Sequence, residues 1–339
     1  MRKINIYSLI VILIIIGSLL LYFFLAQPDD VDIKIGYNVE SVNLAPIMIA
    51  YDKDIFNKHG LKVRLVPLKS GNETKQALAT GQIDIGSAGV NNFFIPISKG
   101  APVKILAPLA LSSTYLFVRP DNQIKTLNDL AGKTVAARIG SSSNLALRFA
   151  LKQEGVDSSN MTFLDINKTY RPIALMEKKI VDAALAQEFM DVIFKQAGAV
   201  ILEEWVTKGY LKQSLPNTVI SVNTDFMVKN LKKTETFIEA LVDSHKFIID
   251  NPDESAALVA KHIALGSAGA MEYSVDDIKK TWQNTKYVLW YDPNIFVEAS
   301  KISREIGDIE NELSLEQLFD LSFRSKLEAA QIEVYGPKN

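Results

Sequence analysis

The sequence predicts an α/β protein built from two blocks of alternating strands and helices, followed by a helical tail. From Asp32 onward, short apolar runs alternate with segments of helical spacing, which is typical of a mostly parallel sheet covered by helices on both faces. The alternation occurs in two blocks, and the chain beyond Asp225 is almost purely helical. With 339 residues, 48% of them hydrophobic, the chain is long enough for two domains with separate cores.

The first block contains four predicted strands and three predicted helices. The strands are expected at residues 33–37, 61–67, 83–87 and 103–108, and the helices at 45–58, 72–80 and 91–98. The pair His59 and Gly60 is expected to end the first helix, because glycine readily takes the left-handed conformation that follows a helix.

The second block repeats this organisation between two extended segments at 114–119 and 217–223. Its strands are expected at 134–138, 161–166 and 181–186, and its helices at 142–153, 171–178 and 188–196. A similar helix-to-strand passage occurs at 77–85 and at 174–184. This similarity indicates either an internal repeat or only the common appearance of such turns.

The two extended segments suggest that the chain crosses into a second lobe and then returns. We therefore expect the first lobe to comprise residues 31–113 and 217–339, with an inserted second lobe at 114–216. The helical tail is expected at 234–250, 252–262, 275–284, 294–307 and 315–328, packed on the first lobe.

Residues 1–30 are expected to form a membrane anchor or a signal segment. Residues 4–26 carry no charge, and Arg2 and Lys3 precede them, which predicts that the rest of the chain is exported. The run is close to the roughly 20 residues that span a bilayer, and Phe24 fits poorly before a cleavage site at Ala26. We favour an uncleaved anchor at the extracytoplasmic face of the membrane; a cleaved segment and a periplasmic or secreted protein is the alternative.

Composition excludes several classes of function. The chain has no cysteine, so disulfides, thiolate metal sites, a cysteine nucleophile and a lipoprotein anchor are excluded. Its three histidines are far apart and show no metal-ligand spacing. The net charge of −2, without a basic stripe, argues against a nucleic-acid partner. No phosphate-binding or nucleophile-elbow motif occurs, and we expect no metal and no cofactor.

The loops after the predicted strands are rich in hydroxyl, amide and glycine residues. In open α/β sheets, ligands bind at the carboxyl ends of strands, where helix amino termini favour anions. The candidate ligand-binding residues are Tyr37, Asn38, Ser70, Gly71, Asn72, Gly89, Asn91, Thr114, Ser141, Ser142, Ser143, Asn144, Tyr170 and Glu188. The loop at residues 140–144 is the strongest candidate, because three hydroxyls and an amide exceed what one helix cap requires.

Each of these residues also has an ordinary structural interpretation. Serine and asparagine side chains cap helices, and Tyr37 and Tyr170 could pack in a core instead of forming walls of a site. Glu188 could complement a helix dipole instead of accepting hydrogen bonds from a ligand. Arg138 could add charge to the site or form an ion pair at the surface.

A set of fragments between Ile33 and Val222 resembles a known family. They include Ile35-Gly36-Tyr37, Leu44-Ala45-Pro46, Gly81-Gln82-Ile83-Asp84-Ile85-Gly86 and Leu127-Asn128-Asp129-Leu130-Ala131-Gly132-Lys133. In this order and spacing the chain resembles the periplasmic substrate-binding proteins of ABC importers for sulfonates, taurine, nitrate and thiamine-precursor pyrimidines. The resemblance implies a two-lobed, type II-like periplasmic-binding-protein fold that clamps a ligand between its lobes.

The resemblance also implies a function. We expect a monomeric, non-catalytic receptor that binds a small solute with an oxoanion head and delivers it to an ABC permease and its ATPase. Aliphatic sulfonates are favoured, with nitrate-like anions and pyrimidine precursors as alternatives. A membrane-tethered ligand sensor is another alternative. An enzyme on the same scaffold would need a reactive histidine or cysteine in the loops named above, which contain neither.

Overall fold

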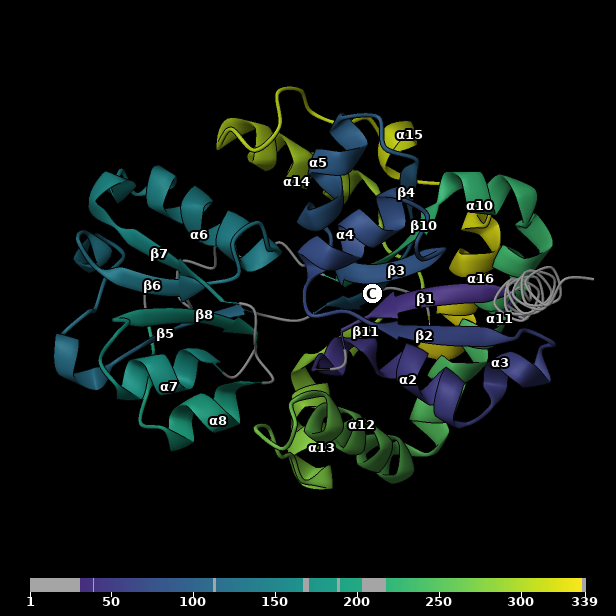
Figure 1. The fold of residues 1–339 in the computed structure, drawn as a ribbon, viewed down its shortest axis with the longest axis horizontal. Coiled ribbons are helices and arrows are strands. Elements are labelled where there is room, and N and C mark those ends of the chain that lie inside the picture. The colour runs from purple at the N-terminus through teal and green to yellow at the C-terminus, as the bar shows by residue number, and fades with distance from the viewer. Residues whose placement is uncertain are drawn as a thin grey trace, which may run out of the picture.

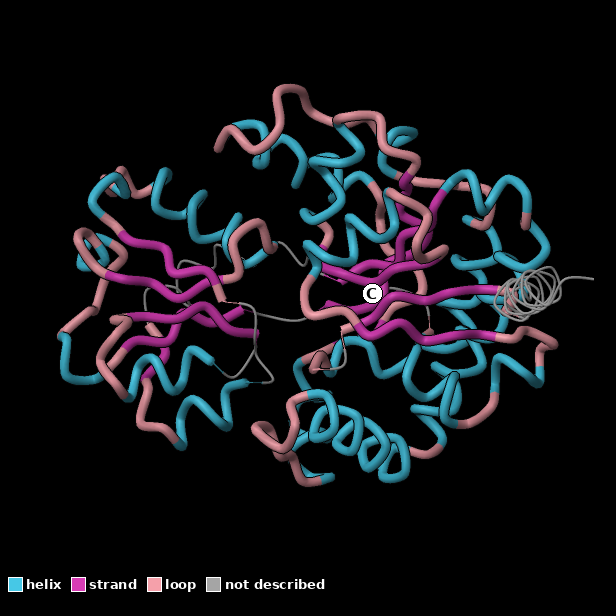
Figure 2. The backbone as a smooth tube through the Cα atoms, in the orientation of Figure 1, coloured by secondary structure: helices cyan, strands magenta, loops and turns pink. Residues whose placement is uncertain are grey.

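Two β-sheets with helices on both faces form the molecule, as Figure 1 shows. The computed structural model describes residues 31–38, 40–111, 114–166, 171–187, 190–202 and 218–336. The first sheet has six strands in the order β11-β4-β10-β3-β1-β2, and the second has five in the order β7-β6-β8-β5-β9. We call each sheet with its helices a lobe; Figure 2 shows the second lobe on the left and the first on the right.

The first lobe is built from both ends of the chain. Its strands are β1 (Ile33–Tyr37), β2 (Val63–Pro67), β3 (Ile85–Gly89), β4 (Val103–Leu111), β10 (Thr218–Asn223) and β11 (Lys286–Tyr287). Its early helices are α2 (Ala45–Asp52), α3 (Ile55–Lys58), α4 (Gly71–Ala79) and α5 (Asn91–Ser98). The later helices are α10 (Thr224–Lys229), α11 (Leu231–Asp250), α12 (Pro252–Gly266), α13 (Val275–Asn284), α14 (Asn294–Glu305), α15 (Leu315–Leu318) and α16 (Arg324–Tyr335).

The second lobe is continuous in sequence. Its strands are β5 (Thr114–Val118), β6 (Thr134–Ala137), β7 (Thr162–Asp165), β8 (Ala183–Gln187) and β9 (Val200–Ile201). Its helices are α6 (Ser142–Gln153), α7 (Arg171–Glu177) and α8 (Asp191–Gln196). We propose the chain division expected from the sequence, since the two ranges assign each described strand to one sheet.

Apart from β11, which pairs antiparallel with β4 at the edge of the first sheet, both sheets share one arrangement of strands. In the first, β1 lies parallel between β2 and β3, and β10 runs antiparallel between β3 and β4. In the second, β6 lies parallel between β7 and β8, and β5 runs antiparallel between β8 and β9. The strands from β1 to β4 therefore share one direction, as do those from β6 to β9, and one reversed strand interrupts each set. The helix-to-strand similarity in the sequence reflects this internal repeat.

An aspartate occupies the same structural position in both lobes. Asp84 precedes β3, and its Oδ2 accepts a hydrogen bond from the backbone N–H of Lys34 on β1 (2.8 Å). Asp182 precedes β8, and its Oδ2 accepts one from the backbone N–H of Thr134 at the start of β6 (3.0 Å). The carboxylates therefore tie β3 to β1 in the first lobe and β8 to β6 in the second.

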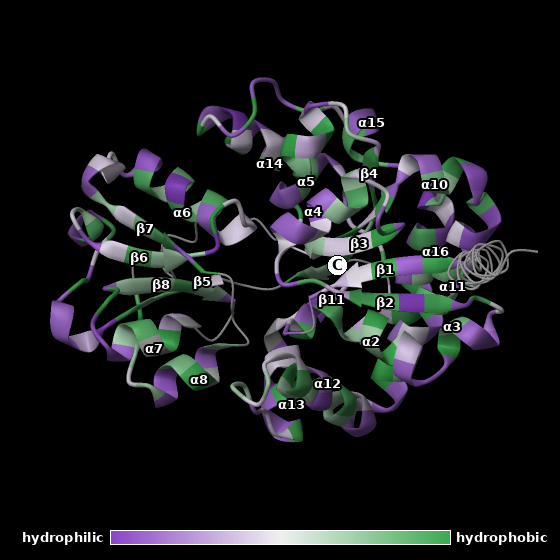
Figure 3. Ribbon diagram, in the orientation of Figure 1, coloured by the Kyte–Doolittle hydropathy of each residue, from purple (hydrophilic) through white to green (hydrophobic). Residues whose placement is uncertain are grey.

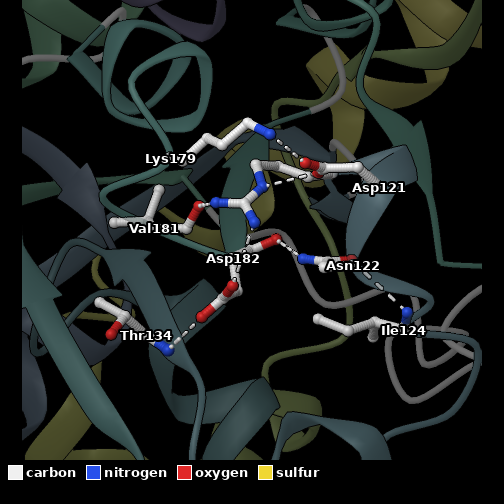
Figure 4. Close-up of polar contacts among 8 residues, drawn as sticks. Asp121, Asn122, Ile124, Thr134, Lys179, Val181 and Asp182 are labelled. Atoms are coloured by element: carbon white, nitrogen blue, oxygen red, sulfur yellow. Dashed lines mark hydrogen bonds and ion pairs between the residues drawn. The ribbon is translucent and has the colours of Figure 1, made fainter.

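Figure 4 shows the polar cluster around this aspartate of the second lobe. Arg119 lies 3.6 Å from the Asp182 carboxylate and donates to the carbonyl of Val181 (3.2 Å). Its Nε also donates to Asp121 (2.9 Å), which Lys179 contacts at 2.7 Å. The cluster stabilises the end of the sheet at which β8 begins.

The structure differs from the predicted elements in a few places. The helix expected at 45–58 divides into α2 and α3, because Asp54 adopts a left-handed backbone conformation with φ of 59°. The helix expected at 315–328 ends at Leu318 and a new one begins at Arg324. The two-residue strands β9 and β11 were not expected, since two residues show no periodicity.

Hydrophobic residues concentrate along the central strands and the inner helix faces, as Figure 3 shows, and form the cores of both lobes. Within the described part of the chain, no helix is long and apolar enough to cross a membrane. The predicted membrane segment at residues 4–26 lies outside the described residues.

Candidate functional site

A cavity of about 160 Å³ lies between the two lobes. Eight of the residues predicted from the sequence line it: Asn38, Ser70, Gly71, Asn72, Gly89, Ser141, Ser142 and Ser143. The first five belong to the first lobe and the three serines to the second, so the two lobes enclose the cavity together.

The cavity lies where strands of both sheets end. Asn38 follows β1, and Gly89 ends β3. From the second lobe, Arg138 follows β6, Asp165 ends β7 and Gln187 ends β8. Because parallel strands present their carboxyl ends at one edge of a sheet, side chains far apart in the sequence meet here.

Helix amino termini also face the cavity from both lobes. The hydroxyl of Ser70 caps α4 by accepting the N–H of Glu73 (3.2 Å). The hydroxyl of Ser141 caps α6 by accepting the N–H of Asn144 (3.2 Å). Asn92, in the first turn of α5, lines the cavity as well. The dipoles of these helices place partial positive charge at the cavity and favour an anionic group there.

Two buried polar atoms at the cavity have no hydrogen-bond partner among the described residues. They are Oδ1 of Asn72 and Oγ of Ser142. The Asn72 side chain donates from its Nδ2 to the carbonyl of Ile139 on the opposite lobe (3.3 Å). Buried polar atoms almost always have a partner, so these two are candidates for contact with a ligand.

A charged pair crosses between the lobes beside the cavity. Arg138 Nη2 lies 3.8 Å from Oε2 of Glu40, whose residue is only 3% exposed. Burial lowers the pKa of Arg138, while Glu40 and Asp165 act in the opposite direction. Asp165 is held in place because its Oδ1 accepts the N–H of Ile139 (2.9 Å). Two roles were expected for Arg138: adding charge to the site, or forming an ion pair at the surface. The side chain lines the cavity, and its ion pair is with the buried Glu40 and not with a surface residue.

Three predicted polar residues hold the loop at 140–144 and do not line the cavity. Thr114 Oγ1 lies 3.3 Å from Ser143 Oγ, and Asn91 donates across the lobes to the carbonyl of Ser141 (3.1 Å). Asn144 accepts the N–H of Gly140 through Oδ1 (3.4 Å). These contacts position the serines without placing the three side chains on the cavity surface.

Tyr37 is 7% exposed and belongs to the hydrophobic core of the first lobe, which is the alternative that its sequence position left open. Burial raises the pKa of its hydroxyl. Tyr170 and Glu188 lie outside the described residues.

Sequence reasoning did not identify several lining residues: Ser41, Leu44, Ile139, Asp165, Ile166, Leu185, Ala186 and Thr218. Asp165 and Ile166 follow the general rule for strand ends, so that rule could have found them. The apolar residues carry no such signal, because the same residue types fill the cores. Among the described residues, no group of three or more histidine, aspartate or glutamate side chains is arranged to hold a metal ion.

Comparison with known families fits this geometry. A profile of the NMT1/THI5-like family matches residues 41–255, which include most of the cavity. The chain belongs to the NMT1/THI5-like family. This result confirms the resemblance inferred from the sequence fragments.

Relatives of this NMT1/THI5-like protein include binding proteins. The taurine-binding periplasmic protein of Escherichia coli is 24% identical over 236 residues, 69% of this chain and 71% of that protein. The structure of the periplasmic aliphatic sulphonate binding protein SsuA from Escherichia coli superposes with a TM-score of 0.67 at 19% identity, covering 85% of this chain and 91% of that one. The periplasmic nitrate-binding protein NrtA from Synechocystis PCC 6803 gives a TM-score of 0.70 at 14% identity, with 88% of each chain covered. The fold is the α/β periplasmic-binding-protein fold with two sheets flanked by helices.

Proposed function

We propose that this protein is the extracytoplasmic solute-binding component of an ABC import system, and that it binds a small oxoanion-bearing solute between its lobes. The buried, unpartnered Ser142 hydroxyl and Asn72 amide oxygen at the cavity carry this proposal. The repeated strand order supports a type II-like assignment of the fold. The role is non-catalytic: the protein captures the solute and hands it to a membrane permease driven by an ATPase.

The ligand class follows from the donors at the cavity. Serine hydroxyls, helix amino termini and the guanidinium of Arg138 all stabilise negative charge on a ligand oxygen. A volume of about 160 Å³ is below the roughly 300–1,000 Å³ of sites for drug-sized ligands, so the solute is small. The apolar residues Leu44, Ile166 and Leu185 provide a surface for a short hydrocarbon part.

An aliphatic sulfonate has an anionic head for the polar side of the cavity and a hydrocarbon part for its apolar side. Aliphatic sulfonates are therefore our first choice. Binding proteins for taurine and for aliphatic sulphonates are among the relatives, which supports the choice. Nitrate-like anions and pyrimidine precursors are the alternatives. Nitrate would use the polar half of the cavity but leave the apolar half without a partner.

Export is part of the proposal, because an ABC importer takes its solute from outside the cell membrane. The relative from Escherichia coli is named a periplasmic protein. We propose that residues 4–26 anchor this chain to the outer face of the cell membrane, since that run carries no charge. In this arrangement the protein acts as a monomer that meets its permease by diffusion along the bilayer.

Isothermal titration calorimetry of the full-length chain tests the function. The ligand panel is ethanesulfonate, taurine, nitrate and a hydroxymethylpyrimidine. We expect the sulfonates to bind, and Ser142→Ala to weaken that binding by about 1–3 kcal/mol because a hydrogen bond to a charged group is lost. Ser98→Ala is the matched control, since Ser98 is exposed at the far end of α5 and donates only to the carbonyl of Ile95.

Two results would contradict the proposal. Binding of none of the four ligands would remove the ligand class, and equal sulfonate affinity in the Ser142→Ala variant and the wild type would remove the loop at 140–144 from the site.

A further inference from the structure

A basic surface with two exposed apolar residues lies at the end of the first lobe away from the cavity. The segment from Val228 to Lys233 spans the end of α10 and the start of α11, and it contains three lysines and no acidic residue. Val228 is 70% exposed and Leu231 is 52% exposed. We call the surface formed by Val228, Lys229, Leu231, Lys232 and Lys233 the basal face.

The chain enters the described fold beside this face. Asp32, just before β1, forms an ion pair with Lys233 (2.9 Å), and its other carboxylate oxygen accepts the N–H of Lys62 (2.9 Å). Five residues, 27–31, separate Asp32 from the end of the apolar run at Ala26. Six steps of at most about 3.6 Å give a reach of roughly 20 Å. An anchor that ends at Ala26 therefore holds the basal face close to the membrane.

We propose that the basal face rests on the surface of a bilayer that contains anionic lipids. This proposal rests on the membrane anchor proposed above. Val228 and Leu231 would lie at the level of the headgroups, where exposed apolar side chains lose contact with water. Lys229 and Lys232 would contact lipid phosphates, because lysine side chains next to a membrane are attracted to its negative surface potential.

The charged residues around the basal face bear on its proposed contact with an anionic bilayer. Lys233 and Lys232 have acidic partners, Asp32 and Glu235 respectively. Lys62 and Arg64, both exposed, lie on the neighbouring chain segment that begins β2. Residues 228–233 contain three lysines and no acidic residue, whereas the chain as a whole carries a net charge of −2. An anionic surface matches these lysines, and a neutral one does not.

The proposed contact leaves the cavity open to solutes. Strand β1 starts at Ile33 beside the basal face and ends at Tyr37, next to the cavity-lining Asn38. In Figure 1 the second lobe lies beyond the other end of this strand. The bilayer would therefore contact one end of the first lobe, while the gap between the lobes lies at the opposite end.

Site-specific fluorescence tests the contact in the full-length chain. Because the protein has no cysteine, single substitutions Val228→Cys, Leu231→Cys and Leu265→Cys can each carry one nitrobenzoxadiazole label. Leu265 is the matched control: it is 71% exposed, and it lies near the end of α12 before the segment in which the Tyr273 hydroxyl contacts Met190 of the second lobe (3.5 Å). The labelled chains are reconstituted into phosphatidylcholine vesicles with and without about 30% phosphatidylglycerol.

We expect labels at 228 and 231 to be quenched by brominated lipids in the anionic vesicles, and to be at least about threefold less accessible to iodide than the label at 265. Omitting the anionic lipid, or introducing Lys229→Gln with Lys232→Gln, should bring iodide accessibility close to that of the control. Both lysines are exposed, so these changes leave the core intact.

Equal iodide accessibility at all three positions in anionic vesicles would overturn the proposal, as would a chain that mass spectrometry finds cleaved before Asp32. Titration of the same preparations with ethanesulfonate separates this outcome from a failure of the proposed function. Sulfonate binding with an accessible basal face rejects only the membrane contact.

Discussion

At the scale of single residues, His245 is a titratable group whose pKa the fold lowers strongly. It is fully buried, and burial lowers its pKa to about 3. Its Nδ1 forms a hydrogen bond with the Tyr335 hydroxyl (2.5 Å), and its ring lies edge-on to Tyr287. The residue holds α11 against α16, and it remains neutral in the folded protein at ordinary pH.

This burial predicts acid sensitivity. An unfolded histidine binds a proton below about pH 6.5, whereas folded His245 does not do so until about pH 3. The stabilising contribution is therefore present above pH 6.5 and is lost as the pH falls from there towards 3. A fall in pH from about 7.5 to about 5 should therefore lower the free energy of unfolding by about 2 kcal/mol.

Urea unfolding of the wild type and His245→Gln at both pH values measures this loss. The free energy of unfolding of the variant should fall by about 2 kcal/mol less than that of the wild type over that interval. His262→Gln is the control, because that histidine is only partly buried and lies beside Asp52 (3.0 Å). The same loss in His245→Gln as in the wild type would show that another group causes the acid sensitivity.

At the scale of elements, the starts of α4 and α5 lie so close together that a side chain at Gly71 would collide with Asn92. A Cβ atom at residue 71 would lie 2.6 Å from Nδ2 of Asn92. That amide lines the cavity and donates to the carbonyl of Gly89 (3.0 Å). The glycine therefore lets the amino termini of α4 and α5 face the same cavity.

Gly71→Ala should displace the Asn92 side chain and break its hydrogen bond. We expect sulfonate affinity to fall about tenfold, which corresponds to one hydrogen bond of about 1.4 kcal/mol. Calorimetry measures the affinity, and Gly132→Ala is the control: its φ of 73° strains an alanine, but no atom lies near the added Cβ. That variant should lose stability and keep its affinity, and the reverse pattern would contradict the prediction.

The sequence was sufficient for most elements and for part of the site. Strand β1 and helices α5, α6 and α13 have the predicted bounds, because each is a periodic apolar run with a clear start and end. Polar residues after strands, such as Ser142, were predicted by a general rule about strand ends. The ion pair of Glu40 with Arg138 was not predicted, because the two residues are 98 positions apart and no local pattern joins them.

At the scale of the whole molecule, a second bridge joins the lobes away from the cavity. Arg148 of α6 donates to the carboxylate of Asp308 (2.6 Å) and to the carbonyl of Ile306 (2.9 Å). Lys152, one turn further along α6, donates to the carbonyl of Glu305 (2.8 Å). These carbonyls end α14, where cations are favourable. Because α14 packs on the first lobe, separation of the lobes would break all three contacts.

Arg148→Gln should therefore weaken ligand binding although residue 148 does not line the cavity. The pair is partly exposed, so we expect a loss of about 1 kcal/mol, or roughly fivefold in affinity. The loss should appear as faster dissociation in stopped-flow measurements, while Arg324→Gln, which removes a pair within α16, serves as the control. An unchanged dissociation rate would show that this bridge does not contribute to holding the lobes together.

The position of β10 in the first sheet has a consequence for how the chain folds. Ile220 pairs with Ser87 on one side and with Ala107 on the other, so one late strand completes a gap between two early ones. During synthesis the entire second sheet emerges before β10, and it can fold as a contiguous unit. The first sheet, although it begins at the amino end, must wait with β3 and β4 unpaired along one edge. The strands that are made first, β1 to β4, are therefore among the last to become native, and they are the part that most needs protection from aggregation while the ribosome finishes.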